Sequence, residues 1–516
     1  MKNLIFFWML GIQSFVSAQA IMQWQNPMGG SQDEEIYAID ACPDGGYIAA
    51  GYTYSSNGDV SQSLGDRDIW VVKTNGTGQL QWEKSLGGSD SDVAHSVISV
   101  SDGGYLVAGF VKSQDGQVTG HHGSYDGWLI KLSASGNIEW QKAIGSDGWE
   151  ELRMVIQTTD GGFIAVGDGD NNNGDVSGNH GFDDVWVVKL SASGNIQWQK
   201  CLGGTHSDRG RAIQQTTDGG YIVGGITKSS NGDVTGNVGD NYYDYWAVKL
   251  DASGQMQWQK TYGGSKDDLL KSIKCTEDGG YVLSGRSESI NGDVTNNHGM
   301  SDYWVVKINA SGQMEWQKSL GGSNIEWFGD LEPTPGGGYL MAGLTGSSNG
   351  DVSDLNGVRD FWVVAINGQG NLLWNKNFGG TDCDDAYDLL LRPDGSFVVA
   401  GGTCSWNGDV SGHHGGSDFW MLQAKASTVG LNQPAEVAAL NLFPNPAADL
   451  VYLQTGENVF ELQVTVFNAL GQVVHKETMG KDEGLDLSGM ANGMYLVQAV
   501  DPSGRQYLGK LQVVHP

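Results

Sequence analysis

The chain has 516 residues, including 79 glycines and 18 tryptophans, a composition typical of many short strands joined by tight turns. Its 60 acidic and 29 basic residues give a formal net charge of −31, which excludes nucleic acid as an electrostatically favourable partner. Beyond the N-terminus no stretch approaches the ~18 consecutive apolar residues of a membrane-spanning helix, so the sequence predicts no transmembrane segment.

The first 20 residues have the three parts of an export signal. Lys2 is followed by an apolar stretch over residues 4–11, and the segment ends in Ala18-Gln19-Ala20, a small-residue pattern typical of a signal-peptide cleavage site. We therefore predict a signal peptide over residues 1–20 and export from the cytosol. The apolar core is too short to span a membrane, which leaves a buried N-terminal helix as the alternative.

Residues 21–424 repeat one unit seven times. A tryptophan after Gln, Glu or Leu recurs every 58 residues, with one interval of 60, at Trp24, Trp82, Trp140, Trp198, Trp258, Trp316 and Trp374. A second tryptophan, two residues after an aspartate, keeps this spacing at Trp70, Trp128, Trp186, Trp246, Trp304, Trp362 and Trp420. One copy predicts four strands, named A to D in chain order, at residues 152–158, 163–167, 186–190 and 196–200.

The ends of the repeat predict that it closes into a ring. The array begins with a D-type strand at residues 22–25 and ends with a C-type strand at residues 419–423. Pairing of these two strands would complete the last sheet and remove both exposed edges. The fold class is therefore all-β, a seven-bladed β-propeller of four-stranded blades followed by a small C-terminal β-sandwich. An open β-solenoid is the alternative for the repeat.

The second copy carries a family resemblance. It contains Gly-Gly-Ser at residues 87–89 with Asp92, then the segments 102–109 and 126–132, then Gly136. This pattern is similar to the bacterial seven-bladed β-propeller repeat family known as SBBP. The resemblance implies a fold for residues 21–424 and no activity, because that family is defined by its blades.

A different domain follows the repeat. Residues 425–438 predict a linker, and four later segments alternate like strands of a small sandwich, at residues 442–447, 464–472, 485–488 and 493–497. In this order they resemble the type A C-terminal sorting domain of the type IX secretion system of Bacteroidota. The resemblance implies that residues 439–516 bind the type IX secretion machinery, and that the protein is secreted or held at the outer-membrane surface. A generic immunoglobulin-like binding module is the alternative.

One acidic residue stands ten positions after each tryptophan of the first series. These seven carboxylates are predicted to lie at the mouth of the central channel, and they are Glu34, Asp92, Glu150, Asp208, Asp268, Glu326 and Asp384. The alternative, which we favour, is that each caps its own D–A loop, because a feature present in every blade is what folding of a repeat requires.

Aromatic residues outside the repeat series are the candidate ligand-binding residues. Trp149, Trp327 and Trp406 are predicted in D–A or B–C loops on one face, joined by Tyr242 and Tyr243 at the two-residue insertion. Aromatic side chains on a solvent-exposed face can stack on sugar rings or bind a protein partner. The alternative is that they pack against neighbouring blades.

Two weaker patterns concern metal binding and oxidation. Asp168, Asp170 and Asn172 resemble the start of a calcium-binding EF-hand loop, although the twelfth position lacks an acid, so no cofactor is expected and Ca²⁺ is a weak candidate. Cys383 and Cys404 flank the A–B hairpin of the last blade at equal distances from its turn, and we predict a disulfide between them.

The sequence contains no G-x-S-x-G, H-E-x-x-H, Walker or dinucleotide-binding motif. We therefore predict an exported or cell-surface binding or scaffold protein whose ligand is a glycan or a protein. The alternative is an extracellular carbohydrate-active enzyme, a glycosidase or lyase, that uses carboxylates on the loop-rich face of the propeller.

Overall fold

The computed structural model describes residues 20–237, 241–426, 438–454, 461–468, 473–480, 483–500 and 506–515. This part of the chain is all-β, as predicted, and divides into one compact unit before residue 427 and another after it. Among the described residues no helix is long and apolar enough to cross a membrane. The predicted signal peptide lies outside the described residues except for Ala20, as does most of the predicted linker.

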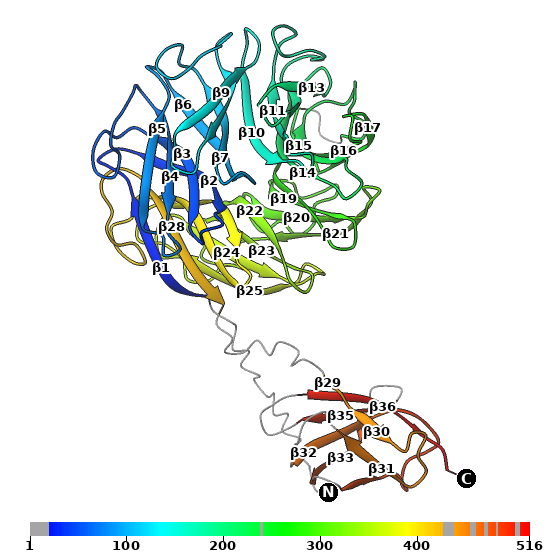
Figure 1. Ribbon diagram of the computed structural model, residues 1–516. Helices are drawn as coiled ribbons and strands as arrows, with labels where there is room; N and C mark the ends of the chain where they lie inside the picture. The colour runs from blue at the N-terminus through cyan, green and yellow to red at the C-terminus, as the bar shows by residue number, and fades with distance from the viewer. Residues whose placement is uncertain are drawn as a thin grey trace, which may run out of the picture. The chain divides into compact units, whose positions relative to one another are not determined.

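The first unit is a seven-bladed β-propeller, which confirms the predicted fold class (Figure 1). Each blade is an antiparallel sheet of four strands. The A strands are β2 (Glu34–Ala41), β6 (Asp92–Ser99), β10 (Glu150–Gln157), β14 (Asp208–Gln215), β18 (Asp268–Cys275), β22 (Glu326–Thr334) and β26 (Asp384–Leu391). The B strands are β3 (Tyr47–Thr53), β7 (Tyr105–Val111), β11 (Phe163–Gly169), β15 (Tyr221–Thr227), β19 (Tyr281–Ser287), β23 (Gly338–Thr345) and β27 (Ser396–Thr403).

The C and D strands form the outer half of each blade. The C strands are β4 (Asp68–Thr74), β8 (Asp126–Leu132), β12 (Asp184–Leu190), β16 (Asp244–Leu250), β20 (Asp302–Ile308), β24 (Asp360–Ile366) and β28 (Asp418–Ala426). The D strands are β5 (Leu80–Leu86), β9 (Ile138–Ile144), β13 (Ile196–Leu202), β17 (Met256–Tyr262), β21 (Met314–Leu320), β25 (Leu372–Phe378) and β1 (Ala20–Met28). Each A strand contacts the A strands of both neighbouring blades, so the seven A strands surround a central channel.

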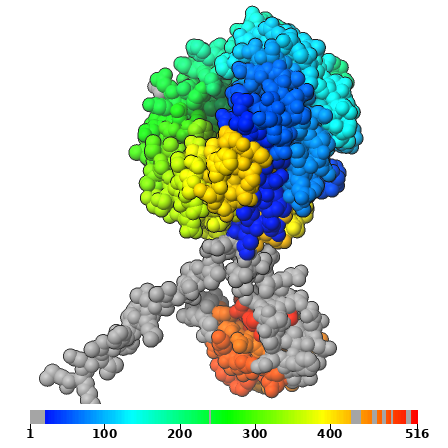
Figure 2. All heavy atoms as spheres, turned by 90° about the vertical axis from the view of Figure 1, so that its left-hand side faces the viewer, coloured from blue at the N-terminus to red at the C-terminus, as the bar shows by residue number. Residues whose placement is uncertain are grey.

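The N-terminal strand closes the ring. β1 pairs antiparallel with β28, from Ala20 opposite Ala426 to Met28 opposite Phe419, and so supplies the D strand of the last blade. Figure 2 shows these N-terminal residues, in dark blue, lying against the last blade, in yellow and orange. Closure through β1 leaves the seventh blade with the same four strands as the other six.

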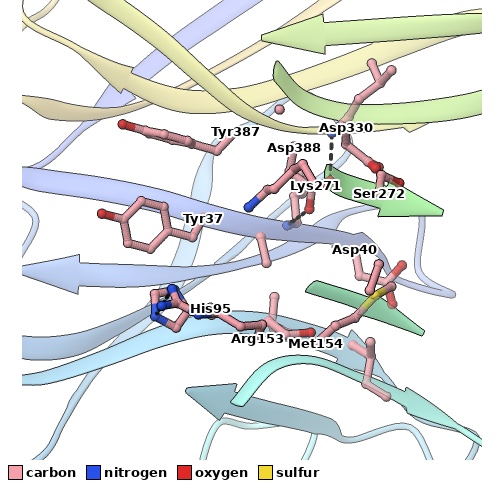
Figure 3. A pocket seen from close by; sticks show the side chains of 18 of the residues that line it. Tyr37, Asp40, His95, Arg153, Met154, Lys271, Ser272, Asp330, Tyr387 and Asp388 are labelled. Atoms are coloured by element: carbon pink, nitrogen blue, oxygen red, sulfur yellow. Dashed lines mark hydrogen bonds between the residues drawn. The ribbon is translucent and has the colours of Figure 1, made fainter. Parts of the chain in front are cut away.

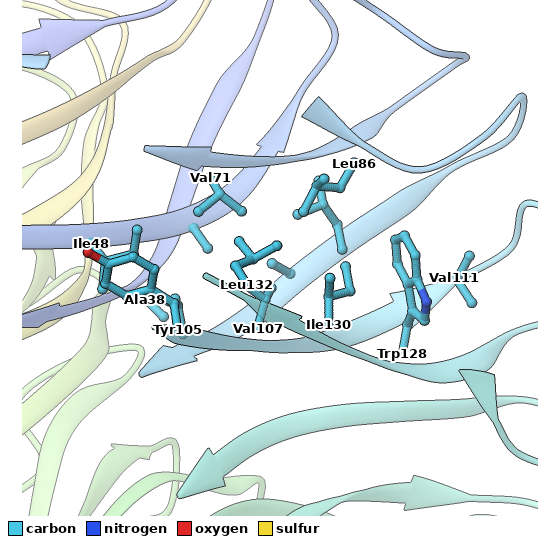
Figure 4. Close-up of a cluster of buried hydrophobic side chains, with 14 of the residues drawn as sticks. Ala38, Ile48, Val71, Leu86, Tyr105, Val107, Val111, Trp128, Ile130 and Leu132 are labelled. Atoms are coloured by element: carbon cyan, nitrogen blue, oxygen red, sulfur yellow. The ribbon is translucent and has the colours of Figure 1, made fainter. Parts of the chain in front are cut away.

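The apolar core lies between blades. The B and C strands are buried on both faces because each blade packs against two neighbours, which explains why they read as continuous apolar runs. Figure 4 shows the cluster between the first two blades, where Ile48 and Val71 of one meet Val107 and Trp128 of the other. All seven C-strand tryptophans are fully buried, at Trp70, Trp128, Trp186, Trp246, Trp304, Trp362 and Trp420.

Every A strand contains a β-bulge at the same position. The pairing of A with B shifts by one residue there, as between Leu152 and Met154 in β10, so that one residue has no partner on strand B. The facing strand-B residue in β11 is Gly167, at which a side chain would overlap the carbonyl oxygen of Glu151. A bulge of this kind bends the strand and redirects the extra side chain. The repeated bulge therefore determines which side chains enter the channel.

The second unit is a small β-sandwich. One sheet has the order β29 (Ala438–Ala439), β36 (Gln506–Val513), β35 (Gly493–Val500), β32 (Glu461–Phe467) and β33 (Val473–Gly480). The other has the order β30 (Asn441–Phe443), β31 (Leu450–Gln454) and β34 (Gly484–Asp486). Val451 and Leu485 of the smaller sheet share one buried cluster with Val464, Val497 and Leu511 of the larger, so the two sheets pack face to face.

Candidate functional site

The seven bulged residues line the central channel. They are Tyr37, His95, Arg153, Arg211, Lys271, Gly329 and Tyr387, and each is the residue skipped by the pairing of its A strand with strand B. Figure 3 shows side chains at these positions projecting from different A strands around one cavity, namely Tyr37, His95, Arg153, Lys271 and Tyr387. The bulge occurs in every blade, but the side chain at the bulged position differs between blades. Three consecutive blades supply a cation there.

Two cavities of about 220 Å³ each occupy the channel. One lies near the starts of the A strands and is lined by His95, Arg153, Arg211, Lys271 and Arg286, with Trp327 and a few apolar residues; we call it the basic cavity. The other extends toward the ends of the A strands and adds the acids Asp40, Asp330, Glu332 and Asp388. The channel is therefore basic toward the D–A loops and acidic toward the A–B turns.

Acidic partners compensate part of the charge of the basic cavity. Arg153 is paired with Glu151, and Asp168 lies 3.9 Å from both Arg153 and Arg211. Burial, and next the positive charge of Arg153, lower the pKa of His95 well below its usual value. The ring is therefore neutral, and its Nε2 accepts a hydrogen bond of 3.1 Å from Arg153.

Lys271 differs from the other cations of the cavity. Its side chain is exposed to the channel, and within the described part of the chain its ammonium group makes no ion pair. Burial by the surrounding channel wall, and the nearby charge of Arg153, lower the pKa of Lys271. Burial also lowers the pKa of Arg211, to about 10. Arg211 therefore stays charged at neutral pH, and the positive charges of Arg153 and Arg211 both disfavour the charged form of Lys271.

Two of the predicted aromatic residues lie at the channel end of the loop face. Trp149 precedes β10, is half-exposed, stacks on Tyr125 at 4.6 Å between ring centroids, and donates its indole N–H to Glu151. Trp327 is predicted in a loop, but the structure places it in β22, half-exposed, where it lines the basic cavity and lies under the guanidinium of Arg286. Every A strand begins at the repeat carboxylate, here Glu326, so Trp327 is the second residue of its strand.

The other predicted aromatic residues lie in B–C loops. Trp406 is exposed and packs edge-on against His413 of its own loop. Tyr242 is exposed, whereas Tyr243 is half-buried, donates to Ser207 and lies under the ammonium of Lys228. None of these three is among the described residues that line the two channel cavities. The structure therefore brings Trp327 to the cavity and leaves Trp406 and Tyr242 as separate exposed residues.

The seven predicted channel-mouth carboxylates do not face the channel, which corrects that placement, and the favoured alternative of loop capping is the one observed. Each is fully buried and accepts a backbone N–H from four residues earlier in its own D–A loop at 2.7 to 2.9 Å. The residues are Glu34, Asp92, Glu150, Asp208, Asp268, Glu326 and Asp384. Their oxygens also accept hydrogen bonds from hydroxyl groups, as Glu34 does from Thr53 and Asp208 from Ser229, both at 2.7 Å, so they belong to the loop framework and not to an open acidic ring.

These carboxylates make stability depend on pH. Each lies close to the carboxylate that begins the C strand of the preceding blade, as Asp208 does to Asp184 across Gly203. Burial raises the pKa of Glu150 to about 7, and it raises the pKa of four others to about 6, namely Asp184, Asp268, Asp302 and Asp360. The folded state therefore holds these protons more strongly than the unfolded chain does.

We expect the propeller to melt several degrees higher at pH 5 than at pH 8. A raised folded-state pKa contributes stability that is present below about pH 4 and is lost as pH rises through 6 to 7. The opposite trend begins below about pH 4, because the unfolded chain then binds protons at three carboxylates whose folded-state pKa values are only about 2, namely Asp160, Asp218 and Asp278. The measurement is the melting temperature of the full chain from pH 3 to 8.

High salt separates this effect from general charge repulsion. Repulsion within a chain of net charge −31 also weakens toward pH 5, but 0.5 M NaCl screens it, whereas buried carboxylates are screened much less. The fall in melting temperature between pH 5 and 8 should persist in high salt. A flat profile there would contradict the buried-carboxylate explanation.

The predicted calcium-binding residues are directed at three different partners. Asp168 is buried in β11 near Arg153 and Arg211, Asp170 accepts the backbone N–H of Trp149 at 2.9 Å, and Asn172 bonds within its own loop. No group of three or more His, Cys, Asp or Glu side chains that could hold a metal ion occurs in the residues described. These three residues therefore do not form the predicted site, and Ca²⁺ binding stays an untested prediction.

The predicted disulfide is not formed. The register is as expected, since the N–H of Cys404 donates to the carbonyl of Cys383 at 2.9 Å, but both thiols are free. Burial raises the pKa of Cys383, and it raises that of Cys404 to about 11. A thiol with such a pKa is protonated at neutral pH, whereas disulfide formation requires a thiolate.

The channel residues escaped the sequence analysis because period-two alternation assigns the wrong face beyond a bulge. A signal was nevertheless present. The column 13 residues after each tryptophan of the first series reads Tyr, His, Arg, Arg, Lys, Gly and Tyr. Three basic residues in consecutive copies are unexpected in a chain with only 29 lysines and arginines. They differ from the residues of the other copies, whereas the position ten residues after each tryptophan is acidic in all seven copies.

Comparison with known proteins identifies the role of the second unit. Residues 441–513 match the family model of the secretion system C-terminal sorting domain. The tail is a type IX sorting domain. A chain with this domain is exported, to the cell surface or beyond it, and interacts with the secretion machinery. The match covers the sandwich only, so the kinship of the propeller with SBBP proteins and an origin in Bacteroidota stay predictions.

Other relatives of this exported chain are distant. The regulatory protein FlaEY of Caulobacter vibrioides is 25% identical over 230 residues, 40% of this chain and 23% of that protein, so the match spans under a quarter of its length. Among solved structures, Sqt1 from Chaetomium thermophilum is 10% identical with a TM-score of 0.42, over 80% of this chain and 100% of that one. A YCF48 structure with a bound D1 peptide is 12% identical with a TM-score of 0.38 over the same shares.

Proposed function

We propose that this type IX cargo is a binding protein that takes a glycan on the face formed by its D–A and B–C loops. The observation that carries the proposal is the exposure of aromatic residues absent from the other blades. Trp149 and Trp327 are 49% and 52% exposed, although burial of an indole would stabilise the fold. A half-exposed tryptophan beside hydrogen-bonding groups such as Glu151 is suited to stacking on a sugar ring.

A protein ligand is the second reading of the same face, since exposed tryptophan and arginine are also frequent at protein interfaces. The carbohydrate-active enzyme is less well supported, because the carboxylates proposed for it are buried and hydrogen-bonded in their loops. Surface attachment through lipopolysaccharide after removal of the tail is part of the proposal and rests on the resemblance of residues 439–516 to type A sorting domains.

Replacing Trp149, Trp327 and Trp406 with Ala should weaken glycan binding at least ten-fold and change the melting temperature little. These rings are exposed, so their loss removes stacking surface and little packing. The measurement is binding of the full chain to a glycan array, followed by unfolding of the same variants.

Trp82→Ala is the matched control. Trp82 packs against the cluster between the first two blades, so its loss should lower stability and leave glycan binding unchanged. A loss of about 3 to 5 kcal/mol in the triple variant would instead identify those tryptophans as packing residues. Release of shorter sugars from a bound glycan would favour the enzyme.

A further inference from the structure

We propose that the basic cavity binds one singly charged oxyanion, a carboxylate or a sulfate ester, carried by an acidic glycan. Four cations from three consecutive blades line it: Arg153 from β10, Arg211 from β14, and Lys271 and Arg286 from β18 and β19. No acidic residue is among the described residues that line it. This inference deepens the proposed function, because it names the class of glycan, and it rests on that function for the rest of the ligand.

The charge balance of the cavity indicates a single negative charge. Arg153 is paired with Glu151, Arg211 lies 3.9 Å from Asp168, and Arg286 donates to Glu288 at 2.8 Å. His95 is neutral, as its lowered pKa requires. Among the four cations, Lys271 alone makes no ion pair with a described residue, and Asp388 and Asp330 act on it only from beyond ion-pair distance, so its positive charge is left facing the channel. Desolvated like charges destabilise one another, and a bound monoanion would relieve this repulsion.

The net charge of −31 makes this arrangement unusual for the chain. Basic residues are half as numerous as acidic ones, yet three of them occupy equivalent bulged positions of neighbouring blades. Ion pairing within the fold does not explain the placement of Lys271, because among the described residues no carboxylate lies within ion-pair distance of it. Arginine guanidinium groups can hold carboxylate or sulfate oxygens through two parallel hydrogen bonds, whereas lysine supplies a point charge.

The size of the cavity limits what enters it. A volume of about 220 Å³ is below the 300 to 1,000 Å³ typical of pockets that enclose a whole drug-sized ligand. It suits one anionic group with its sugar ring, while the remaining sugars would extend over the loop face. Trp327 lines the cavity and is half-exposed, and it therefore links the cavity to the aromatic face.

Lys271→Met tests the site. The full chain is titrated by calorimetry with sodium methyl sulfate, a singly charged sulfate ester, at constant ionic strength, and with tetragalacturonate and its fully methyl-esterified form, which has the same rings without the charges. The native chain should bind methyl sulfate, and should bind the acidic tetrasaccharide at least ten-fold more tightly than the ester. In Lys271→Met both the binding of methyl sulfate and the preference for the acidic tetrasaccharide should be lost, while the ligand-free variant melts higher because the repulsion is removed.

Lys260→Met is the matched control, since it makes the same change on the exposed outer strand β17. It should bind methyl sulfate and prefer the acidic tetrasaccharide like the native chain. Equal binding of methyl sulfate by Lys271→Met and the native chain would overturn the proposal, as would no binding of methyl sulfate by the native chain. Binding of methyl sulfate that neither tetrasaccharide displaces would reject the glycan as the source of the anion.

The two proposals can fail separately. Trp327→Ala should lower the affinity for both tetrasaccharide forms by the same factor and keep the ratio of the two affinities, because the indole contacts the sugar ring and not its carboxylate. Unchanged affinity in Trp327→Ala with discrimination still lost in Lys271→Met would contradict the aromatic face and support the anion site. The reverse pattern would support the aromatic face and contradict the anion site.

Discussion

Deletion of residues 20–28 is expected to lower the melting temperature of the propeller by about 10 °C or more. This segment is β1, and it pairs eight of its residues with β28 to complete the last blade. Each lost hydrogen bond costs about 1 kcal/mol net, and the deletion also removes Met28 from the core and exposes the edge of β28. The measurement is thermal unfolding of the full chain with and without the segment.

A peptide with the sequence of residues 20–28 provides the control. Added in excess to the deleted chain, it should restore most of the lost stability, because it can occupy the vacant D-strand position of the seventh blade. A scrambled peptide should not. An unchanged melting temperature after deletion would contradict closure through β1, since an open array does not depend on its first strand.

Deletion of residues 438–516 is expected to abolish export to the cell surface and to leave a folded propeller in the periplasm. The sandwich has its own buried cluster, formed by residues such as Val464 and Leu511, and shares no strand with any blade. Deletion of the sandwich should therefore remove the sorting signal without unfolding the propeller. The measurements are protease accessibility on intact cells and the melting temperature of the retained protein.

A fusion of residues 438–516 to an unrelated exported reporter is the complementary experiment. The fusion should reach the surface if the address is contained in this segment. Val464→Asp, which places a charge in the buried cluster, should prevent it by unfolding the sandwich. Normal surface display of the truncated propeller would contradict the sorting role in this protein.

The repeat itself could be predicted from the sequence, because the spacing of the tryptophans and the turn residues depends on local structure. The strands predicted at 152–158 and 196–200 are observed as β10 and β13, with ends that differ by no more than two residues. The predicted pairing of the first strand with the last C strand follows from the same repeat and is observed in β1 and β28.

The candidate site was harder to predict because its geometry depends on non-local contacts. The bulge at Arg153 follows from the close approach of β11 at Gly167, which strand periodicity does not express. The sequence left two alternatives for the seven repeat carboxylates, the channel mouth or the D–A loop. The structure shows that Glu150 accepts the backbone N–H of Ser146 in that loop. For the cysteines, pairing of the strands was predictable, but the state of the thiols was not.

Ring closure through β1 also orders the events of biogenesis. The D-strand position of the seventh blade is filled by the first strand of the propeller, but its partner β28 ends at Ala426, just before the tail. A chain interrupted before β28 lacks both the strand that closes the ring and the sorting domain that follows it. Incomplete propellers with exposed strand edges therefore have no sorting domain. The C-terminal position of this domain restricts secretion to chains that contain every strand needed to close the ring.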